Sequence, residues 1–513
     1  MRPFGSVVLL TVLAGAGMAF AQSSTGTAPA GVVLPASGRN NQGGSVGATQ
    51  LPVPGTTASV NTLNPSVQIS GPYTGSAAGA GAMPFSGKLS LEEALRRGLA
   101  YNLGAVGLGQ SVRQTGTQVT VARSALLPNV NGSLSETVQQ TDLAAMGLSI
   151  RVPGFRIPSV AGPFNYFALQ ASLSQTVANL TLLNNYRSAQ ATARASQYNL
   201  RNARDLVTLA VGGAYLQVLA AQARVDAAQA QLDTANAVFH QSTEQHRQGV
   251  VGRLNVDQSQ VRTLTQQQQT ITLRNDLAKQ KINLARLTGL PPNADYQLTD
   301  TFPFSAARVQ SVEDAVAQAR QQRADLKAAQ SQVEAAAKAL AAARAERLPS
   351  AAVSGNYEAI GTNPARSHGA FAVTGTVSIP LWQGGRAAGD IEQAAAVLAQ
   401  RRAELEDTRG QVEAEVRQSY LDLEAAAGQV EVAGDNLRVA RETLEMTRAR
   451  MEAGVINTVE VVQAQQTVAG AQLDLIDSVF AHNLAKLSLA RALGNAAEQL
   501  PSLLGAQGAP GAR

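Results

Sequence analysis

The chain of 513 residues contains no cysteine, which excludes disulfide bonds, thiolate chemistry and a thioether-linked lipid. Aromatic residues make up only 4% of the sequence, which is little material for one large compact core. The formal net charge of +5 is small for this length and argues against a nucleic-acid-binding surface. Of these shortages, that of aromatic residues favours an elongated body.

Long apolar runs are scarce as well. Residues 1–21 combine a positive start, a short apolar run and a small-residue cleavage site, which predicts a secretory signal peptide. No later run approaches the roughly 20 apolar residues that a transmembrane helix needs. The sequence therefore predicts an exported chain without a membrane-spanning helix.

Motifs of catalysis are missing too. The sequence has no HExxH, GxSxG or Walker-type phosphate loop. His240 and His246 lie six residues apart, so they do not share a helix face as i, i+4 partners would. His368 is expected in a loop and His482 on a helix, and all four histidines are interpreted as surface residues. We therefore expect no enzymatic activity, no cofactor and no metal site.

What the chain does contain is a second copy of itself. Tyr215 recurs as Tyr420, and the same shift of 205 residues carries Gly249 onto Gly454. Further upstream, Leu127-Pro128 recurs as Leu348-Pro349 at a shift of 221 residues, so the first copy holds 16 extra residues between the two blocks. Repeats of this size predict a pseudo-symmetric body with two similar halves.

Composition and repeats divide the chain into five segments. After the signal peptide, residues 22–87 are rich in Gly, Ser, Thr and Pro and are predicted to form a flexible tail. The alternative is that this segment, with Arg39 as its only charge before residue 88, lies against a folded surface. The first repeat spans residues 88–300 and the second spans 301–500. Residues 501–513 are expected to form a short C-terminal tail.

Each repeat is predicted to hold a short helix, a longer helix that stops at Leu127-Pro128 or Leu348-Pro349, two strands, a long helix and a returning helix. Ser90 and Ser311 are expected to cap the first helix of each copy. Alternating apolar and polar residues predict strands at about 129–139, 165–177, 351–360 and 370–382. These lengths suit a tilted crossing of a bilayer. The loop at about 140–164 accommodates the extra residues of the first copy.

The long helices are predicted at about 184–247 and 386–452, and each would reach on the order of 95 Å. Large residues repeat every seven positions, with small residues three positions later, which is the pattern of a coiled coil. In the first copy these are Val211, Val218, Val225, Leu232 and Phe239 beside Ala214, Ala221, Ala228 and Ala235. Gly212-Gly213 within this helix indicates either a close approach by another element or a local kink.

Returning helices are predicted at about 256–289 and 459–493. They follow short turns at Gly249 and Gly454, where glycine suits the left-handed position after a helix C-terminus. Each copy would thus end in a helical hairpin.

A sheet of four strands cannot lie in a membrane by itself, because its two edges would leave backbone groups unpaired in hydrocarbon. Self-association is therefore required. Three chains would supply twelve strands, enough for a closed barrel with a lumen.

Two segments carry a resemblance to a known family. Val377-Ser378-Ile379-Pro380-Leu381-Trp382-Gln383-Gly384-Gly385-Arg386 resembles the strand-to-helix signature of the TolC-like outer-membrane efflux family. The turns Gly249-Val250-Val251 and Gly454-Val455-Ile456 resemble the helix-hairpin turns of that family. The resemblance covers about residues 88–500, in both copies.

The resemblance implies a mainly α fold with a membrane β portion. Four strands per chain would join a shared 12-stranded trimeric β-barrel in the cell outer membrane, and the coiled-coil helices would form a periplasmic α-barrel. The implied partners are two further copies of the chain, a periplasmic adaptor protein and an inner-membrane pump. The implied function is a passive exit duct of a tripartite efflux pump or a type I secretion system, with its cargo left open.

The family also implies a constriction at the helix tips. Carried over by position, Glu460 falls on an acidic ring position, while Gln463 and Asn255 fall on two further positions and are neutral. Three Glu460 carboxylates around a narrow axis would favour cations. Alternatively, Asn457 and Glu460 form an Asn-x-x-Glu pattern, in which Glu460 reaches back to cap the start of its own helix. Asp257 is a further candidate near the constriction. The alternative is that it is only a solvated acid in the first turn of its helix.

Three basic residues are candidate partners of these acids. Arg253, Arg448 and Arg450 could pair with them across neighbouring hairpins and keep the tip shut. Exposed pairs contribute less than about 1 kcal/mol each, so closure would need several together. The competing function is a periplasm-spanning structural or adhesion coiled coil without a lumen, and a third possibility is an adaptor protein with one helical hairpin.

Overall fold

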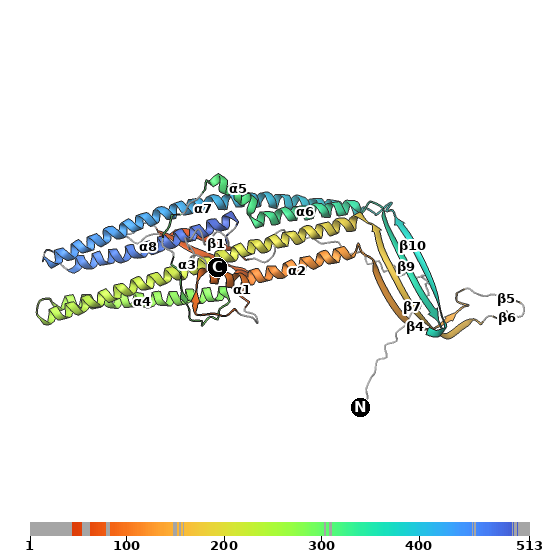
Figure 1. Ribbon diagram of the computed structural model, residues 1–513, viewed down its shortest axis with the longest axis horizontal. Coiled ribbons are helices and arrows are strands. Elements are labelled where there is room, and N and C mark those ends of the chain that lie inside the picture. Colours follow the sequence, from red (N-terminus) through yellow and green to blue (C-terminus); the bar gives the residue numbers. More distant parts are fainter. Residues whose placement is uncertain are drawn as a thin grey trace, which may run out of the picture.

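The computed structural model describes most of the chain between residues 44 and 500. The described ranges are 44–53, 62–77, 83–146, 151–152, 155–156, 158–301, 304–306, 310–453, 455, 458–494, 496 and 500. The predicted signal peptide and the C-terminal tail lie outside these ranges. Figure 1 shows an elongated molecule in which a helical rod ends in a β-sheet on one side and in two helical hairpins on the other.

Two helical hairpins form the rod. The first consists of α3 (Leu180–Arg247) and α4 (Arg253–Thr288), and the second of α7 (Arg386–Glu452) and α8 (Thr458–Leu493). Their ends lie within four residues of the predicted ends. The predicted coiled-coil seam is confirmed over most of its length, since its valines and alanines are buried in α3, whereas Leu232 and Phe239 are half-buried. In α7 the equivalent Leu444 is half-buried and the other counterparts are buried: Val416, Leu423, Val430, Leu437, Ser419, Ala426, Ala433 and Ala440.

Shorter helices complete the rod beside the long ones. The first copy supplies α1 (Leu91–Tyr101) and α2 (Leu103–Ser124), and the second supplies α5 (Val312–Gln322) and α6 (Ala324–Ala345). Ser90 Oγ accepts a bond from the Glu93 N–H and Ser311 Oγ one from the Asp314 N–H, each at 3.2 Å, which confirms both N-caps. The helices α2 and α6 end shortly before the two Leu-Pro pairs, as predicted.

The duplication is visible in the hydrogen bonds. Tyr215 Oη donates to the carbonyl of Leu89 at 3.0 Å, and Tyr420 Oη donates to the carbonyl of Gln310 at 3.1 Å. Leu89 and Gln310 are equivalent positions of the two repeats, as are the two tyrosines. The same tether therefore joins the long helix to the start of the short helix in both halves.

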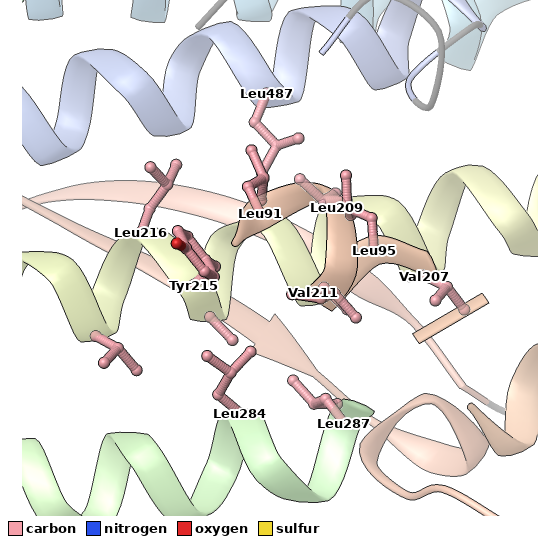
Figure 2. Close-up of a cluster of buried hydrophobic side chains, with 14 of the residues drawn as sticks. Leu91, Leu95, Val207, Leu209, Val211, Tyr215, Leu216, Leu284, Leu287 and Leu487 are labelled. Carbon is pink, nitrogen blue, oxygen red and sulfur yellow. The ribbon is translucent and has the colours of Figure 1, made fainter. Parts of the chain in front are cut away.

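The main core lies around the middle of α3, where α1, α4 and α8 pack against it (Figure 2). Leu91 and Leu95 of α1 meet Val211 of α3, Leu284 of α4 and Leu487 of α8 there. By composition α3 is long and apolar enough to cross a membrane, but 72% of that stretch is buried inside the protein. This burial is typical of a core helix.

The portion predicted to lie in the membrane is a four-stranded antiparallel sheet with the strand order β10-β9-β7-β4. Its strands are β4 (Asn129–Asp142), β7 (Val160–Ala178), β9 (Ser350–Gly361) and β10 (Ser367–Ser378). All four predicted strands are present, and β4 and β10 form the two edges of this sheet. The long β4–β7 connection includes β5 (Arg151–Val152) and β6 (Phe155–Arg156), and η2 (Pro364–Arg366) lies in the β9–β10 turn.

Two details of the sheet differ from expectation. Strand β10 ends at Ser378 and not at about 382, because Pro380 lacks the N–H that a further ladder bond would need. Leu381 and Trp382 instead stand 92% and 89% exposed in the single chain. His368, expected in a loop, lies in β10, opposite Ile360.

The register gives this sheet one apolar and one polar face. On the apolar face Leu134 lies opposite Leu169, and Tyr357 lies opposite Phe371. Shifted by one residue, the polar face places Ser133 opposite Gln170. Such a split is expected when one face of a barrel contacts lipid and the other lines water.

The prediction of a flexible tail over residues 22–87 is wrong for residues 44–53 and 62–77, where the alternative of a segment lying against a folded surface is confirmed. They form the hairpin of β1 (Val46–Val53) and β2 (Thr62–Ile69), followed by η1 (Gly71–Thr74). The hairpin packs on α3, where a Cβ atom at Gly213 would come within 2.4 Å of Val67 Cγ2. Gly212 admits Leu487 of α8 in the same way, at 3.0 Å. The glycine pair thus allows close approach from two sides while α3 continues through it.

Candidate functional site

The two hairpin turns lie at the same end of the rod, the end that is farthest from the sheet (Figure 1). The first turn joins α3 to α4 and the second joins α7 to α8. The predicted constriction residues all belong to these turns or to the helical turns next to them.

The first turn is closed by a Schellman motif. Gly249 adopts a φ of 73°, and its N–H donates to the carbonyl of His246 at 3.0 Å. The N–H of Val250 donates to the carbonyl of Gln245 at 2.9 Å. These two bonds satisfy the last carbonyls of α3, and only a residue that tolerates the left-handed region can occupy position 249.

The second turn repeats this geometry. The N–H of Val455 donates to the carbonyl of Arg450 at 3.0 Å, in the same relation as Val250 to Gln245. Gly454, the predicted turn glycine, lies outside the described residues. Both long helices therefore reverse direction by a bond of the same type.

Glu460 and Gln463 lie on one face of α8, in its first turns, and both side chains are exposed. Val461 and Ala464 face the opposite way and are buried. Because residues three apart share a helix face, the acid and the amide form one exposed polar row that points away from the buried seam. Asn457, needed for the alternative capping role of Glu460, lies outside the described residues.

The first copy presents the equivalent row without a charge. Asn255 and Gln258 occupy the positions of Glu460 and Gln463 in the repeat. Asn255 lies in the first turn of α4, half-buried, and its N–H donates to the carbonyl of Gly252 at 3.1 Å. Across the two tips, this row carries one carboxylate per chain.

Within the described part of the single chain, no ion pair joins the tip arginines to Glu460 or Asp257 across the two hairpins, and pairs between neighbouring hairpins of an assembly stay a prediction. Arg253 Nε lies 3.7 Å from Asp257 Oδ2 on the same helix, with side chains 84% and 55% exposed. Arg450 lies in the last turn of α7, where a positive charge suits the negative end of the helix dipole. Among the described side chains, neither Arg448 nor Arg450 contacts Glu460 or Asp257 as an ion pair.

The interpretation of all four histidines as surface residues is wrong for His482. Its side chain is 1% exposed on α8, and its ring centroid lies 4.8 Å from that of Phe304. Burial, and secondarily the charge of Lys486, lowers the pKa of His482 to about 4. Lys486 is itself buried and donates to the carbonyl of Ser305 at 2.6 Å. The repeat held a signal for this burial, since Leu277 occupies the equivalent position of the first copy.

The described residues contain no group of three histidine, cysteine, aspartate or glutamate side chains that could hold a metal ion. What the tip offers chemically is therefore charge and hydrogen bonding from exposed polar side chains. Such a site can sort passing solutes by charge and size.

Comparisons with known proteins agree with this geometry. The family described as "Outer membrane efflux protein" matches residues 109–290 and 315–495, which are the two repeats. No curated protein sequence matches the chain.

Solved structures with the same fold include the CmeC outer membrane channel of Campylobacter jejuni, at 18% identity and a TM-score of 0.68 over 79% of this chain and 86% of that one. The outer membrane protein VceC of Vibrio cholerae has 18% sequence identity and a TM-score of 0.67, over 79% of this chain and 96% of that one. The MtrE outer membrane channel of Neisseria gonorrhoeae, in its open state, has 17% sequence identity and a TM-score of 0.66, over 79% of this chain and 89% of that one. At these identities the likeness concerns the fold.

The family match spans most of the chain and both of its repeats. An adhesion coiled coil without a lumen would not need the sheet that lies between the helices of each repeat. The sheet lies in the outer membrane and the helices project into the periplasm. The chain belongs to the outer membrane efflux protein family and is the outer-membrane exit duct of an efflux pump.

Proposed function

We propose that this exit duct is a homotrimer in which β10 of one copy pairs with β4 of the next. The observation that carries the proposal is the described sheet, which has two open edges and two chemically distinct faces. Open edges in hydrocarbon would leave N–H and C=O groups unpaired, at a cost of several kcal/mol each. Threefold pairing removes every edge and yields twelve strands around a polar lumen.

The long helices extend this lumen through the periplasm. In the trimer they would form an α-barrel, with α3, α4, α7 and α8 of each copy in its wall. The hairpin tips would meet a periplasmic adaptor protein and an inner-membrane pump. The chain is passive in this arrangement, and the pump supplies the energy.

The tip constriction would select by charge. Three Glu460 carboxylates, one per copy, would surround the axis, while Gln463 and Asn255 would add neutral hydrogen-bonding groups. Asp257 contributes less, because Arg253 on its own helix lies 3.7 Å away. Closure of the tip by Arg253, Arg448 and Arg450 would require pairs between neighbouring hairpins.

The trimer and the tip are tested by conductance of the full-length protein in planar bilayers. Glu460→Gln should lower the ratio of cation to anion permeability, by about twofold at low salt, because screening is weak there. Asn255→Asp is the matched variant at the equivalent position, and it should raise the same ratio. Absence of conductance after the tip is disrupted would contradict the trimeric duct. Conductance with the same ratio in both variants would contradict only the tip assignment.

A further inference from the structure

The four-stranded sheet carries very little charge. Strands β4, β7, β9 and β10 contain no lysine and no arginine, and their only acids are Glu136, Asp142 and Glu358. Asp142 ends β4, and its Oδ1 accepts the N–H groups of Ala144 and Ala145 at 3.0 and 3.2 Å. It therefore holds a turn, and only two acids remain within the body of the sheet.

The register places these two acids on opposite faces. Glu136 lies opposite Phe167, in the set of positions that includes Leu134 and Leu169. Glu358 lies between Gln170 on one side and Ala370 on the other. Because side chains alternate along a strand, Glu136 belongs to the apolar face and Glu358 to the polar face.

The membrane decides which face points where. The apolar face must contact hydrocarbon, so the polar face lines the lumen. Glu136 is on the lipid side. Its partners across the sheet are Phe167 and then Gly361, so it lies level with the β9–β10 turn, at the border of the apolar band. There Asn165 Nδ2 donates a hydrogen bond to Glu136 Oε1 at 3.2 Å. Glu358 lies three residues from the same turn, so it faces the lumen near its outer mouth.

We propose that Glu358 is a selectivity-determining residue of the duct. In the trimer, on which this inference rests, three Glu358 side chains carry the negative charge on the lumen face within the body of the described sheet. The remaining acid of the sheet, Asp142, ends β4 and accepts the N–H groups of the turn that follows. The three Glu358 carboxylates would attract cations and repel anions at the outer end of the channel, far from the tips. Their nearest titratable neighbour on that face is His368 of β10, which lies two residues from Ala370, the partner of Glu358.

Screening sets the size of this effect. The Debye length is about 10 Å at 0.1 M salt and about 3 Å at 1 M. Three charges on the wall of a twelve-stranded barrel therefore influence much of the lumen at 0.1 M and little of it at 1 M. The selectivity due to Glu358 should be modest and should disappear at high salt.

The test measures reversal potentials of the full-length protein in planar bilayers under a KCl gradient. Glu358→Gln should lower the ratio of potassium to chloride permeability by about twofold near 0.1 M and leave it unchanged near 1 M. The matched control is Glu136→Gln, the same chemical change on the lipid side of the same sheet, which should leave the ratio unchanged. Repeating the pair in a Glu460→Gln background measures the outer ring without the tip charge.

Each outcome separates the two proposals. A conducting Glu358→Gln channel with the wild-type ratio would overturn the role of Glu358 and leave the trimeric duct standing. An equal loss in Glu136→Gln would overturn the assignment of the two faces. A wild-type protein that does not conduct, even with its tip disrupted, would overturn both proposals together.

Discussion

The two repeats interrupt their helices at the same place with different chemistry. A single residue separates the short helix from the next one: Asn102 lies between α1 and α2, and Arg323 between α5 and α6. Their backbone angles are nearly identical, with φ of −60° and −58° and ψ of 129° in both. The duplication has preserved the backbone break while its side chain changed completely.

The first copy stabilises the break with neutral groups. Asn102 is fully buried, and its Oδ1 accepts the Gly104 N–H at 3.0 Å. Its Nδ2 donates to the carbonyl of Tyr73 at 2.8 Å, in the N-terminal segment that covers this half of the rod. The N-terminal segment removes the Asn102 side chain from water, but the amide oxygen and the amide nitrogen each have a hydrogen-bond partner.

The second copy stabilises the break with charges. Arg323 is 1% exposed, donates from Nε to Asp325 at 3.0 Å and also pairs with Glu415, while Arg491 lies 3.8 Å from both acids. Burial raises the pKa of Asp325, but the hydrogen bond and charge of Arg323 outweigh it and hold that pKa below its usual value. Gly104 and Ala210 occupy the positions of Asp325 and Glu415 in the first copy.

The difference teaches that the exposure of a helix break decides whether neutral or charged side chains can stabilise it. Beneath the N-terminal segment, the amide of Asn102 with its hydrogen bonds made is sufficient. In the second copy Asp325 and Glu415 keep 23% and 32% exposure, so a cluster of charges can retain part of its hydration.

The largest expected effect comes from removing the centre of the charge cluster. Arg323→Ala should lower the free energy of unfolding by about 3–5 kcal/mol, because it leaves two acids without their main partner. Asn102→Ala should cost less, about 1–3 kcal/mol. Urea unfolding of the detergent-solubilised protein measures both.

A transplant sharpens this comparison. Arg323→Asn, Asp325→Gly and Glu415→Ala together give the second copy the residues of the first. The triple variant should be more stable than Arg323→Ala alone, since it leaves neither of those acids unpaired. If it is equally unstable, charge compensation is not the reason for the cluster.

The next effect concerns the packing of the β1–β2 hairpin on α3. Gly213→Ala should cost about 1–3 kcal/mol, because its Cβ would overlap Val67 of β2. Adding Val67→Ala should restore much of the loss. The control is Gly428→Ala in α7, where a Cβ would meet nothing within 4 Å, and this change should stabilise by roughly 0.5–1 kcal/mol. Similar losses at positions 213 and 428 would mean that hairpin contact is not what requires glycine.

The smallest effect appears only in the pH dependence of stability. Burial outweighs the nearby charge of Arg491 and raises the pKa of Asp205 to about 6, so the folded state binds its proton more strongly than the unfolded state. This contribution to stability is lost as pH rises from about 4 to about 6. His482, with a pKa of about 4, acts in reverse, and its contribution is lost as pH falls from about 6.5 to about 4.

The two slopes oppose each other, so single variants should reveal each of them. Asp205→Asn should give a stability that rises with pH across this interval, by about 1–2 kcal/mol. His482→Leu, which installs the residue of the first copy, should give a stability that falls with pH. Thermal unfolding between pH 4 and 7 measures the slopes, and parallel curves for both variants would contradict the assignment.

Local patterns determined a large part of this protein. The heptads, the alternating strands, Ser90 and Ser311 as caps and Gly249 as a turn residue depend on contacts within a few positions of the chain. Each follows from the periodicity of one element or the dihedral needs of one residue, so it can be derived before folding is considered. The same holds for the spacing that puts Glu460 and Gln463 on one helix face.

Contacts between distant segments decided the rest. Residues 44–77 have the composition of a flexible tail, and those that are described are ordered because Val67 meets Gly213 and Tyr73 receives the bond of Asn102. His482 is buried because Phe304, far away in sequence, lies against its ring. The opposite faces of Glu136 and Glu358 depend on strand register. No periodicity along the chain encodes such pairings, because they depend on which surfaces meet after the elements have formed.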